Sequence, residues 1–234
     1  MAASLPSLSS RQSTPAICTQ AGKAPYNRGL LQVWDDAHAT LYGYLSPEPV
    51  PALVGSPYGW VTQNPANALQ GVYTCGGPPQ GSGGWLLGAS NARTVPGASA
   101  DAIGLFASAP ADNFSPNLSP VNNASFVTFM PAYVTAPEAI PNSGDIGAGV
   151  EGWYESAVWG TAPGPDASGT MRYWFTPGWV DKDFGQSTVW LELAACLGQG
   201  LLVGTGDFAT FTSVHDYWCA QPWVKVKLAA SVYP

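Results

Sequence analysis

The chain has few basic residues. Only 8 of its 234 residues are Lys or Arg, and Arg93 is the single basic residue between Arg28 and Arg172. Proteins bind nucleic acids and anionic membrane surfaces through patches of Lys and Arg, so this composition argues against both kinds of partner. It also leaves a trypsin-like protease almost nothing to cleave in the middle of the chain. This suits a protein whose loops face a protease-rich exterior.

Charged residues of both signs are scarce as well. They make up 10% of the chain, whereas an ordinary globular protein has roughly 25%. The net charge of −7 still favours solubility through self-repulsion. With 10 Trp, 10 Tyr and 8 Phe, the chain has more buriable surface than a disordered protein would have. The sequence therefore predicts a folded domain with an unusually neutral surface.

Long apolar runs are absent too. No stretch is long enough to cross a membrane, and the first residues, MAASLPSLSSRQSTP, lack the basic start and apolar stretch of a signal peptide. We therefore expect no membrane insertion. Residues 1–28, rich in Ser, Pro and Thr, are predicted to form an irregular arm, and residues 29–234 a single β-rich domain.

Short β-type runs separated by turn residues follow the arm. Runs 30–34 and 39–45 flank Asp35-Asp36 and predict a hairpin. No segment has the apolar period of an amphipathic helix. The pattern predicts an all-β fold, a β-barrel or a jelly-roll-like sandwich with long Gly/Pro/Asn-rich loops. The other predicted strands are 69–75, 85–89, 102–107, 124–134, 150–159, 170–176, 187–195, 207–214 and 223–233.

Three of these segments carry more specific expectations. Pro131 interrupts run 124–134 and predicts an edge strand or a bulge. Residues 160–169, GTAPGPDASG, have the composition of a turn. In run 223–233, apolar residues alternate with Lys225 and Lys227, which predicts a half-buried strand with both lysines at a sheet edge or on the surface.

Cysteine and histidine spacings do not indicate a metal site or a cofactor. Cys18, Cys75, Cys196 and Cys219 are far apart, and both two disulfides and four buried free thiols are compatible with the sequence. The Gly-rich segment 75–85 does not match the spacing of a phosphate-binding loop. We therefore predict no metal ligand and no cofactor.

The sequence also lacks a convincing catalytic set. Glu151 and Glu155 share one face of a predicted strand, but residues four apart on a strand are roughly 13 Å apart. Glycosidases hold their two carboxylates about 5–9 Å apart. Glu192 lies on another predicted strand and offers a second partner. His38 and His215, which precedes Asp216, have no GxSxG-type nucleophile turn to serve. We predict no catalytic residue.

Aromatic residues beside Gly- and Pro-rich turns are the predicted contacts for a receptor or another ligand, because exposed rings anchor partners. The alternative is that each ring folds back and caps an end of the barrel. We expect at least one of the set to contact a partner. The set is Tyr42, Tyr44, Tyr58, Trp60 and Trp85.

In length, composition and layout of β runs over residues 25–234, the chain resembles viral capsid spike domains, most of all the astrovirus spike. Spikes of the nodavirus, hepevirus and calicivirus kind are also similar. The resemblance implies a non-enzymatic domain on the virion surface that forms a homodimer and binds a host-cell receptor, either a protein or a glycan. It also implies recognition by neutralising antibodies. Such capsids are cleaved by trypsin outside the spike, which agrees with the scarcity of Lys and Arg.

The competing prediction is a secreted β-sandwich glycoside hydrolase or carbohydrate-binding module. The many Trp residues, the acidic balance and the paired Glu residues favour this class. The poor carboxylate spacing argues against the hydrolase. A structural phage or adhesin module is a third class compatible with the composition.

Overall fold

The computed structural model describes parts of the chain from Tyr26 onward. These parts are residues 26–47, 61–74, 87–89, 102–108, 118, 124–132, 142–145, 151–155, 159–181 and 187–230. Strand β1 (Tyr26–Asp35) begins three residues before the predicted domain start. Residues 26–28 therefore belong to the first strand and not to the predicted arm, whose remaining residues lie outside the described parts.

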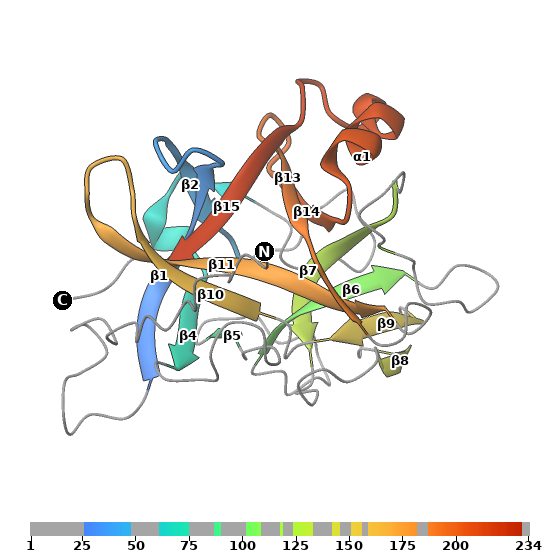
Figure 1. The fold of residues 1–234 in the computed structure, drawn as a ribbon, viewed down its shortest axis with the longest axis horizontal. Coiled ribbons are helices and arrows are strands. Elements are labelled where there is room, and N and C mark those ends of the chain that lie inside the picture. Colours follow the sequence, from blue (N-terminus) through green and yellow to red (C-terminus); the bar gives the residue numbers. More distant parts are fainter. Residues whose placement is uncertain are drawn as a thin grey trace, which may run out of the picture.

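The described chain is built almost entirely of β-strands with a single α-helix, α1 (Phe208–Val214), as Figure 1 shows. The 3-10 turns η2 (Pro65–Asn67) and η4 (Asp216–Trp218) are the other helical elements. No helix in the described part is long and apolar enough to span a membrane. The strands after β1 are β2 (Leu41–Leu45), β3 (Val61–Thr62), β4 (Gln70–Thr74), β5 (Leu87–Ala89), β6 (Ala102–Ser108), β7 (Phe126–Ala132), β8 (Asn142–Asp145), β9 (Glu151–Glu155), β10 (Trp159–Pro165), β11 (Met171–Asp181), β12 (Ser187–Trp190), β13 (Glu192–Cys196), β14 (Leu201–Thr205) and β15 (Val224–Ala230).

The strand pairings form a closed antiparallel circuit. It runs from β1 through β4, β5, β6, β7, β14, β13 and β15 and returns to β1. Strand β1 takes part twice, because residues 26–30 pair with β4 and residues 31–35 pair with β15. This arrangement confirms the predicted all-β, barrel-like fold.

The main core lies on the inner face of this curved sheet. The largest fully buried side chains in this core are those of Trp159, Trp179, Phe129 and Phe175. The Trp159 ring lies 5.8 Å from that of Phe129 on β7 and 6.5 Å from that of Phe175 on β11. Its Nε1 donates a hydrogen bond of 2.9 Å to the carbonyl oxygen of Ile103 on β6. Trp159 therefore ties the β10–β11 hairpin to the β6–β7 side of the molecule.

A second, smaller core lies on the opposite face of β13 and β14, beneath α1 (Figure 1). Phe211 of α1 is fully buried there, and its ring lies 5.0 Å from that of Trp223. A disulfide joins Cys196 at the end of β13 to Cys219 after η4. The alternative of four free thiols, one of the two that the sequence allows, is therefore wrong, because Cys196 and Cys219 are paired. Cys18 and Cys75 lie outside the described residues.

The predicted strand 207–214 is wrong, because this segment forms α1. Asp207 caps the helix: its Oδ1 accepts a hydrogen bond of 3.0 Å from the backbone N–H of Thr210. The N–H of Phe208 donates to Glu192 Oε2 at 2.9 Å. Two backbone donors at the helix start are thus satisfied, and burial of Phe211 holds the turn against the sheet. In this segment, helix capping and the packing of Phe211 outweigh the local β propensity of the residues.

The predicted turn at 160–169 is also largely wrong. Strand β10 runs to Pro165 and pairs with β11 over seven residues, so only the segment from Asp166 to Thr170 turns. The predicted strand 150–159 is correspondingly two strands, β9 and β10. The small residues of β10 serve a packing purpose, because Gly160 and Gly164 leave room for the rings of Trp190 and Trp174.

Lys225 and Lys227 were predicted to lie either at a sheet edge or on the surface, and the edge position is wrong. Strand β15 is central, with β1 on one side and β13 and β11 on the other. Lys225 forms an ion pair with Glu192, and Lys227 Nζ lies 3.4 Å from Asp36 Oδ1. Strand β7 lies between β6 and β14, with Pro131 opposite Ile103 of β6. The predicted edge position or bulge at Pro131 stays a prediction, because the described pairs of β7 with β14 are limited to residues 126 and 127.

Two glycines allow a direct test of backbone strain. Gly43 has a φ of +153°, and a Cβ there would lie 2.6 Å from the carbonyl oxygen of Thr62. Gly169 has a φ of +84°, but a Cβ there would meet nothing within 4 Å. We expect Gly43→Ala to lower the free energy of unfolding by about 3 kcal/mol and Gly169→Ala by about 1 kcal/mol, measured by urea titration. Equal losses would show that the contact with Thr62 carries no weight.

Candidate functional site

The structure describes two of the five predicted contact residues. Tyr42 is the extra residue of a β-bulge, because Gly43 lies opposite Val33 and Leu41 lies opposite Trp34. Its side chain is half-buried and packs against the main core. Tyr44, also half-buried, lies opposite Gln32 on β1. Tyr58, Trp60 and Trp85 lie outside the described residues.

The described carboxylates of the glycosidase alternative are both engaged in the fold. Glu155 is buried, and its carboxylate accepts hydrogen bonds of 3.0 and 3.3 Å from the backbone N–H of Val180. Glu192 pairs with Lys225 and accepts from the N–H of Phe208. Burial and hydrogen bonding to β11 give Glu155 a structural role, and the contacts with Lys225 and α1 give one to the partly exposed Glu192. The side chain of Glu151 lies outside the described residues.

Both histidines are also held by aromatic neighbours. His38 occupies the turn between β1 and β2 with a φ of +59°, and its ring stacks on that of Trp174 at 3.7 Å. The ring of His215 lies 4.1 Å from that of Trp218 and 4.9 Å from that of Phe211. Its Nε2 lies 3.1 Å from the carbonyl oxygen of Ala124. In the described part of the chain, no group of three His, Cys, Asp or Glu side chains could hold a metal ion.

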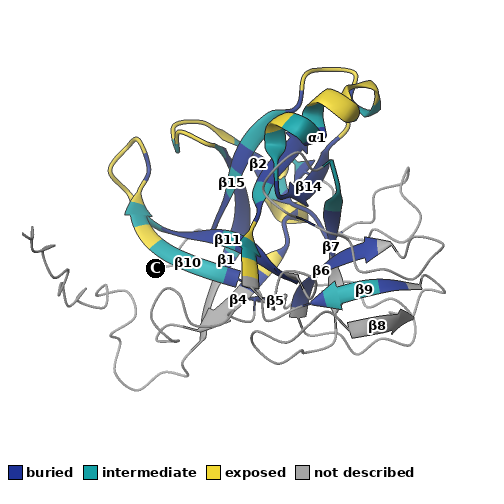
Figure 2. Cartoon of the chain, turned by 45° about the vertical axis from the view of Figure 1, so that its right-hand side comes forward, coloured by how far each residue is buried: buried dark blue, intermediate teal, exposed yellow. Residues whose placement is uncertain are grey.

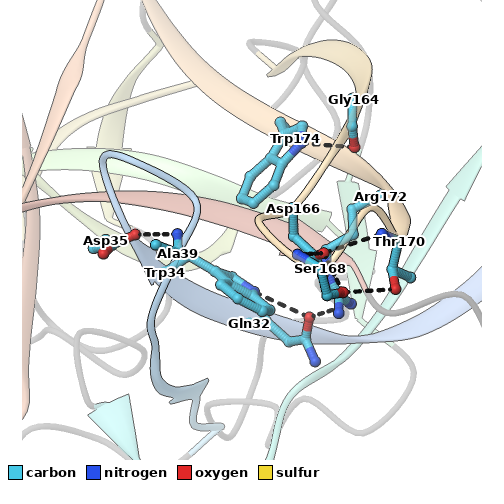
Figure 3. A network of polar contacts seen from close by, with 10 residues as sticks. All are labelled: Gln32, Trp34, Asp35, Ala39, Gly164, Asp166, Ser168, Thr170, Arg172 and Trp174. Carbon is cyan, nitrogen blue, oxygen red and sulfur yellow. Dashed lines mark hydrogen bonds and ion pairs between the residues drawn. The ribbon is translucent and has the colours of Figure 1, made fainter.

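A polar and aromatic cluster joins the β1–β2 hairpin to the β10–β11 hairpin on the outer face of the sheet (Figure 3). Arg172 Nε donates to Asp166 Oδ2 at 2.6 Å, and Arg172 Nη1 donates to Gln32 Oε1 at 3.0 Å. The guanidinium carbon lies 4.6 Å from the centre of the Trp34 ring. We call this set, completed by Trp174, the hairpin clasp.

Asp166 is the electrostatic centre of the hairpin clasp. Hydrogen bonding from the Ser168 hydroxyl, together with Arg172 and the N–H groups of Thr170 and Ser168, lowers its pKa to about 2, although burial opposes ionisation. The backbone N–H of Ala167 donates to the carbonyl oxygen of His38 at 2.9 Å. The hairpin clasp thus ties the tips of both hairpins together by ionic, aromatic and backbone contacts.

The second notable surface is the lobe formed by α1 and η4, which extends from the sheet and whose residues are mostly exposed or of intermediate exposure (Figure 2). Tyr217 is 74% exposed and Val214 is 49% exposed, more than any other large apolar residues of the described chain. The disulfide at Cys219 fixes this lobe, and Trp223 Nε1 donates to the carbonyl oxygen of His215 at 2.9 Å. The lobe thus presents an apolar ring on a firmly anchored base.

The third surface centres on Trp190, which is 47% exposed at the end of β12. Its six-membered ring occupies the space that a Cβ at Gly160 would take, and it lies within 3.3 Å of the place of a Cβ at Gly178. Neither Trp190 nor Tyr217 is among the predicted contacts, because those are aromatic residues beside Gly- and Pro-rich turns. The alternation Thr188–Val189–Trp190 was the available signal, since it places Thr188 and Trp190 on one face of β12.

Comparison with known proteins adds no relative. Neither a protein-family model, a curated protein nor a solved structure matches the chain.

Proposed function

We propose that the chain is a non-enzymatic capsid spike domain that attaches a virion to a host-cell receptor, forms a homodimer and is a target of neutralising antibodies. Its place would be the virion surface. The all-β, barrel-like fold and the neutral surface support this function. The composition supports it too, because a spike exposed to host proteases gains from a middle segment with so few Lys and Arg residues.

The exposed Tyr217 on its anchored lobe is the observation that carries the proposal. An aromatic side chain that is mostly in water supplies a large contact area when a partner covers it. The disulfide and the Asp207 cap hold the lobe in one conformation, so little conformational entropy is lost on binding. A preorganised, exposed ring is what an attachment surface requires.

A binding experiment tests the proposal. The purified chain, fluorescently labelled, is expected to bind at least one line in a panel of cultured animal cells and to elute as a dimer by light scattering. We expect Tyr217→Ala to weaken cell binding about tenfold or more. Met171→Ala removes a large apolar side chain of β11 that is 43% exposed, and this variant is expected to bind like the wild type. A monomer that binds no cell line would contradict the proposal.

An activity assay on the same protein distinguishes the spike from the alternative function, a secreted glycoside hydrolase. Release of reducing sugars from a polysaccharide panel, abolished by Glu151→Gln, would favour it over the spike. Glu192→Gln is a less informative variant, because it also weakens the ion pair with Lys225 and the contact with the start of α1.

A further inference from the structure

Trp190 packs against glycines of two strands, and nearly half of its side chain is accessible to solvent. A Cβ at Gly160 would lie 2.7 Å from its Cζ3 atom, and a Cβ at Gly178 would lie 3.3 Å from the same atom. Glycines on two neighbouring strands therefore form a bed for the six-membered ring. Because 47% of the side chain remains accessible, the indole is fixed in place without being enclosed.

The described neighbours of the ring on this face of β10 and β12 are neutral and small. Thr188 precedes Trp190 by two residues on the same face, and Thr176 lies opposite Gly160 on β11. Ala162 follows on the same face of β10. None of the described side chains on this face of β10 and β12 carries a charge. The surface thus offers one aromatic face with hydroxyl groups beside it.

This combination selects the chemistry of a ligand. A phosphate or carboxylate would find no cation among the described side chains of β10 and β12, and Arg172 of β11, four residues from Thr176, is already paired with Asp166. The desolvation of such a ligand would therefore go uncompensated. The negative face of an aromatic ring attracts the weakly positive C–H groups of a flat partner. Threonine hydroxyls both donate and accept hydrogen bonds and so match hydroxyl groups of a ligand. A pyranose ring has both features, a C–H face and a rim of hydroxyls.

We propose that Trp190 is the stacking platform of a binding site for a neutral sugar ring, with Thr176 and Thr188 beside it. Gly160 and Gly178 set the height and orientation of the indole. This site lies on β10, β11 and β12, whereas the Tyr217 surface lies on the α1 lobe. The sugar site does not depend on attachment through Tyr217, so either proposal can fail alone.

The test is a titration of the full chain with oligosaccharides. An array of neutral and sialylated glycans identifies ligands, and calorimetry measures the affinity of the strongest neutral one. We expect Trp190→Ala to lower this affinity about tenfold or more, as loss of a stacking ring does elsewhere. Gly160→Ala retains the indole but places a methyl group where its ring lies, so it should lower affinity several-fold. Met171→Ala, which removes an exposed apolar side chain that belongs to neither site, should bind the glycan like the wild type.

Thermal unfolding of each variant shows whether the domain remains folded. Three results would overturn the proposal: no binding of neutral glycans at millimolar concentration, unchanged affinity in Trp190→Ala, or binding confined to sialylated glycans. A dimer that Trp190→Ala dissociates, without neutral-glycan binding, would assign the ring to contact with a second copy of the chain and would equally overturn it.

Discussion

Replacing Trp159 with alanine is expected to lower the free energy of unfolding by about 4 kcal/mol. The side chain is fully buried between Phe129 and Phe175, so its removal leaves a cavity in the main core. The carbonyl oxygen of Ile103 also loses its donor. Since a domain of this kind is stable by about 5–15 kcal/mol, such a loss is a large part of the total. Urea titration followed by circular dichroism measures it.

Two further variants separate the effect of the lost hydrogen bond from the effect of the lost buried ring. Trp159→Phe keeps most of the ring but not the hydrogen bond to Ile103, and should cost about 1–3 kcal/mol. Tyr217→Ala removes an aromatic side chain that is 74% exposed and should change stability by about 0.5 kcal/mol or less. A Trp159→Ala variant as stable as Tyr217→Ala would show that Trp159 does not join the β10–β11 hairpin to the β6–β7 side.

The second large effect concerns Asp166 in the hairpin clasp. We expect Asp166→Asn to lower the free energy of unfolding at neutral pH by about 3 kcal/mol, because Arg172 is then left mostly buried without its carboxylate. The amide of Asn can still accept hydrogen bonds from Ser168 and Thr170. The loss therefore reports chiefly on the charge and on the Arg172 contact.

The same residue predicts a pH dependence. The pKa of Asp166 is lowered from 3.8 to about 2 in the folded chain, so the carboxylate stabilises the fold at pH values above the unfolded pKa. This contribution is lost as pH falls from about 4 toward 2. The stability difference between wild type and Asp166→Asn should therefore shrink by about 2 kcal/mol over that range.

Asp36→Asn is the matched control for Asp166→Asn. Asp36 is 45% exposed and pairs with Lys227 at 3.4 Å on the surface, and such pairs contribute about 1 kcal/mol or less. Its substitution should change stability little at any pH. An Asp166→Asn effect as small as that of Asp36→Asn, or one that does not vary between pH 4 and 2, would contradict the assigned role of the hairpin clasp.

Much of the strand layout follows from local sequence. The hairpin at Asp35-Asp36 is correctly predicted from the turn residues between two β runs. The alternation along β15 is correctly predicted because Val226 and Leu228 are buried, whereas Lys225 and Lys227 are partly exposed. Strand β14 escapes prediction for the opposite reason. Leu202 faces the main core while Leu201 and Val203 face the core under α1, so all its residues are buried and no alternation remains.

The candidate sites were harder to predict because each depends on partners distant in sequence. From the sequence, Glu192 is a possible catalytic carboxylate. In the structure it contacts Lys225 and the start of α1. From the sequence, Trp190 is one of many aromatic residues on strands. In the structure its ring lies on Gly160, thirty positions earlier in the chain. Neither contact leaves a local pattern, since residues brought together by strand pairing carry no fixed spacing.

Composition and short-range alternation were enough to predict the class of the fold, because a buried strand face leaves a local pattern in the sequence. The tertiary structure decided the closure of the strand circuit, the pairing of Cys196 with Cys219 and the change of segment 208–214 from predicted strand to helix. It also decided which aromatic rings remain in water. The reason is that each of these depends on free energies of long-range contacts, which outweigh local propensities of about 1 kcal/mol or less per residue.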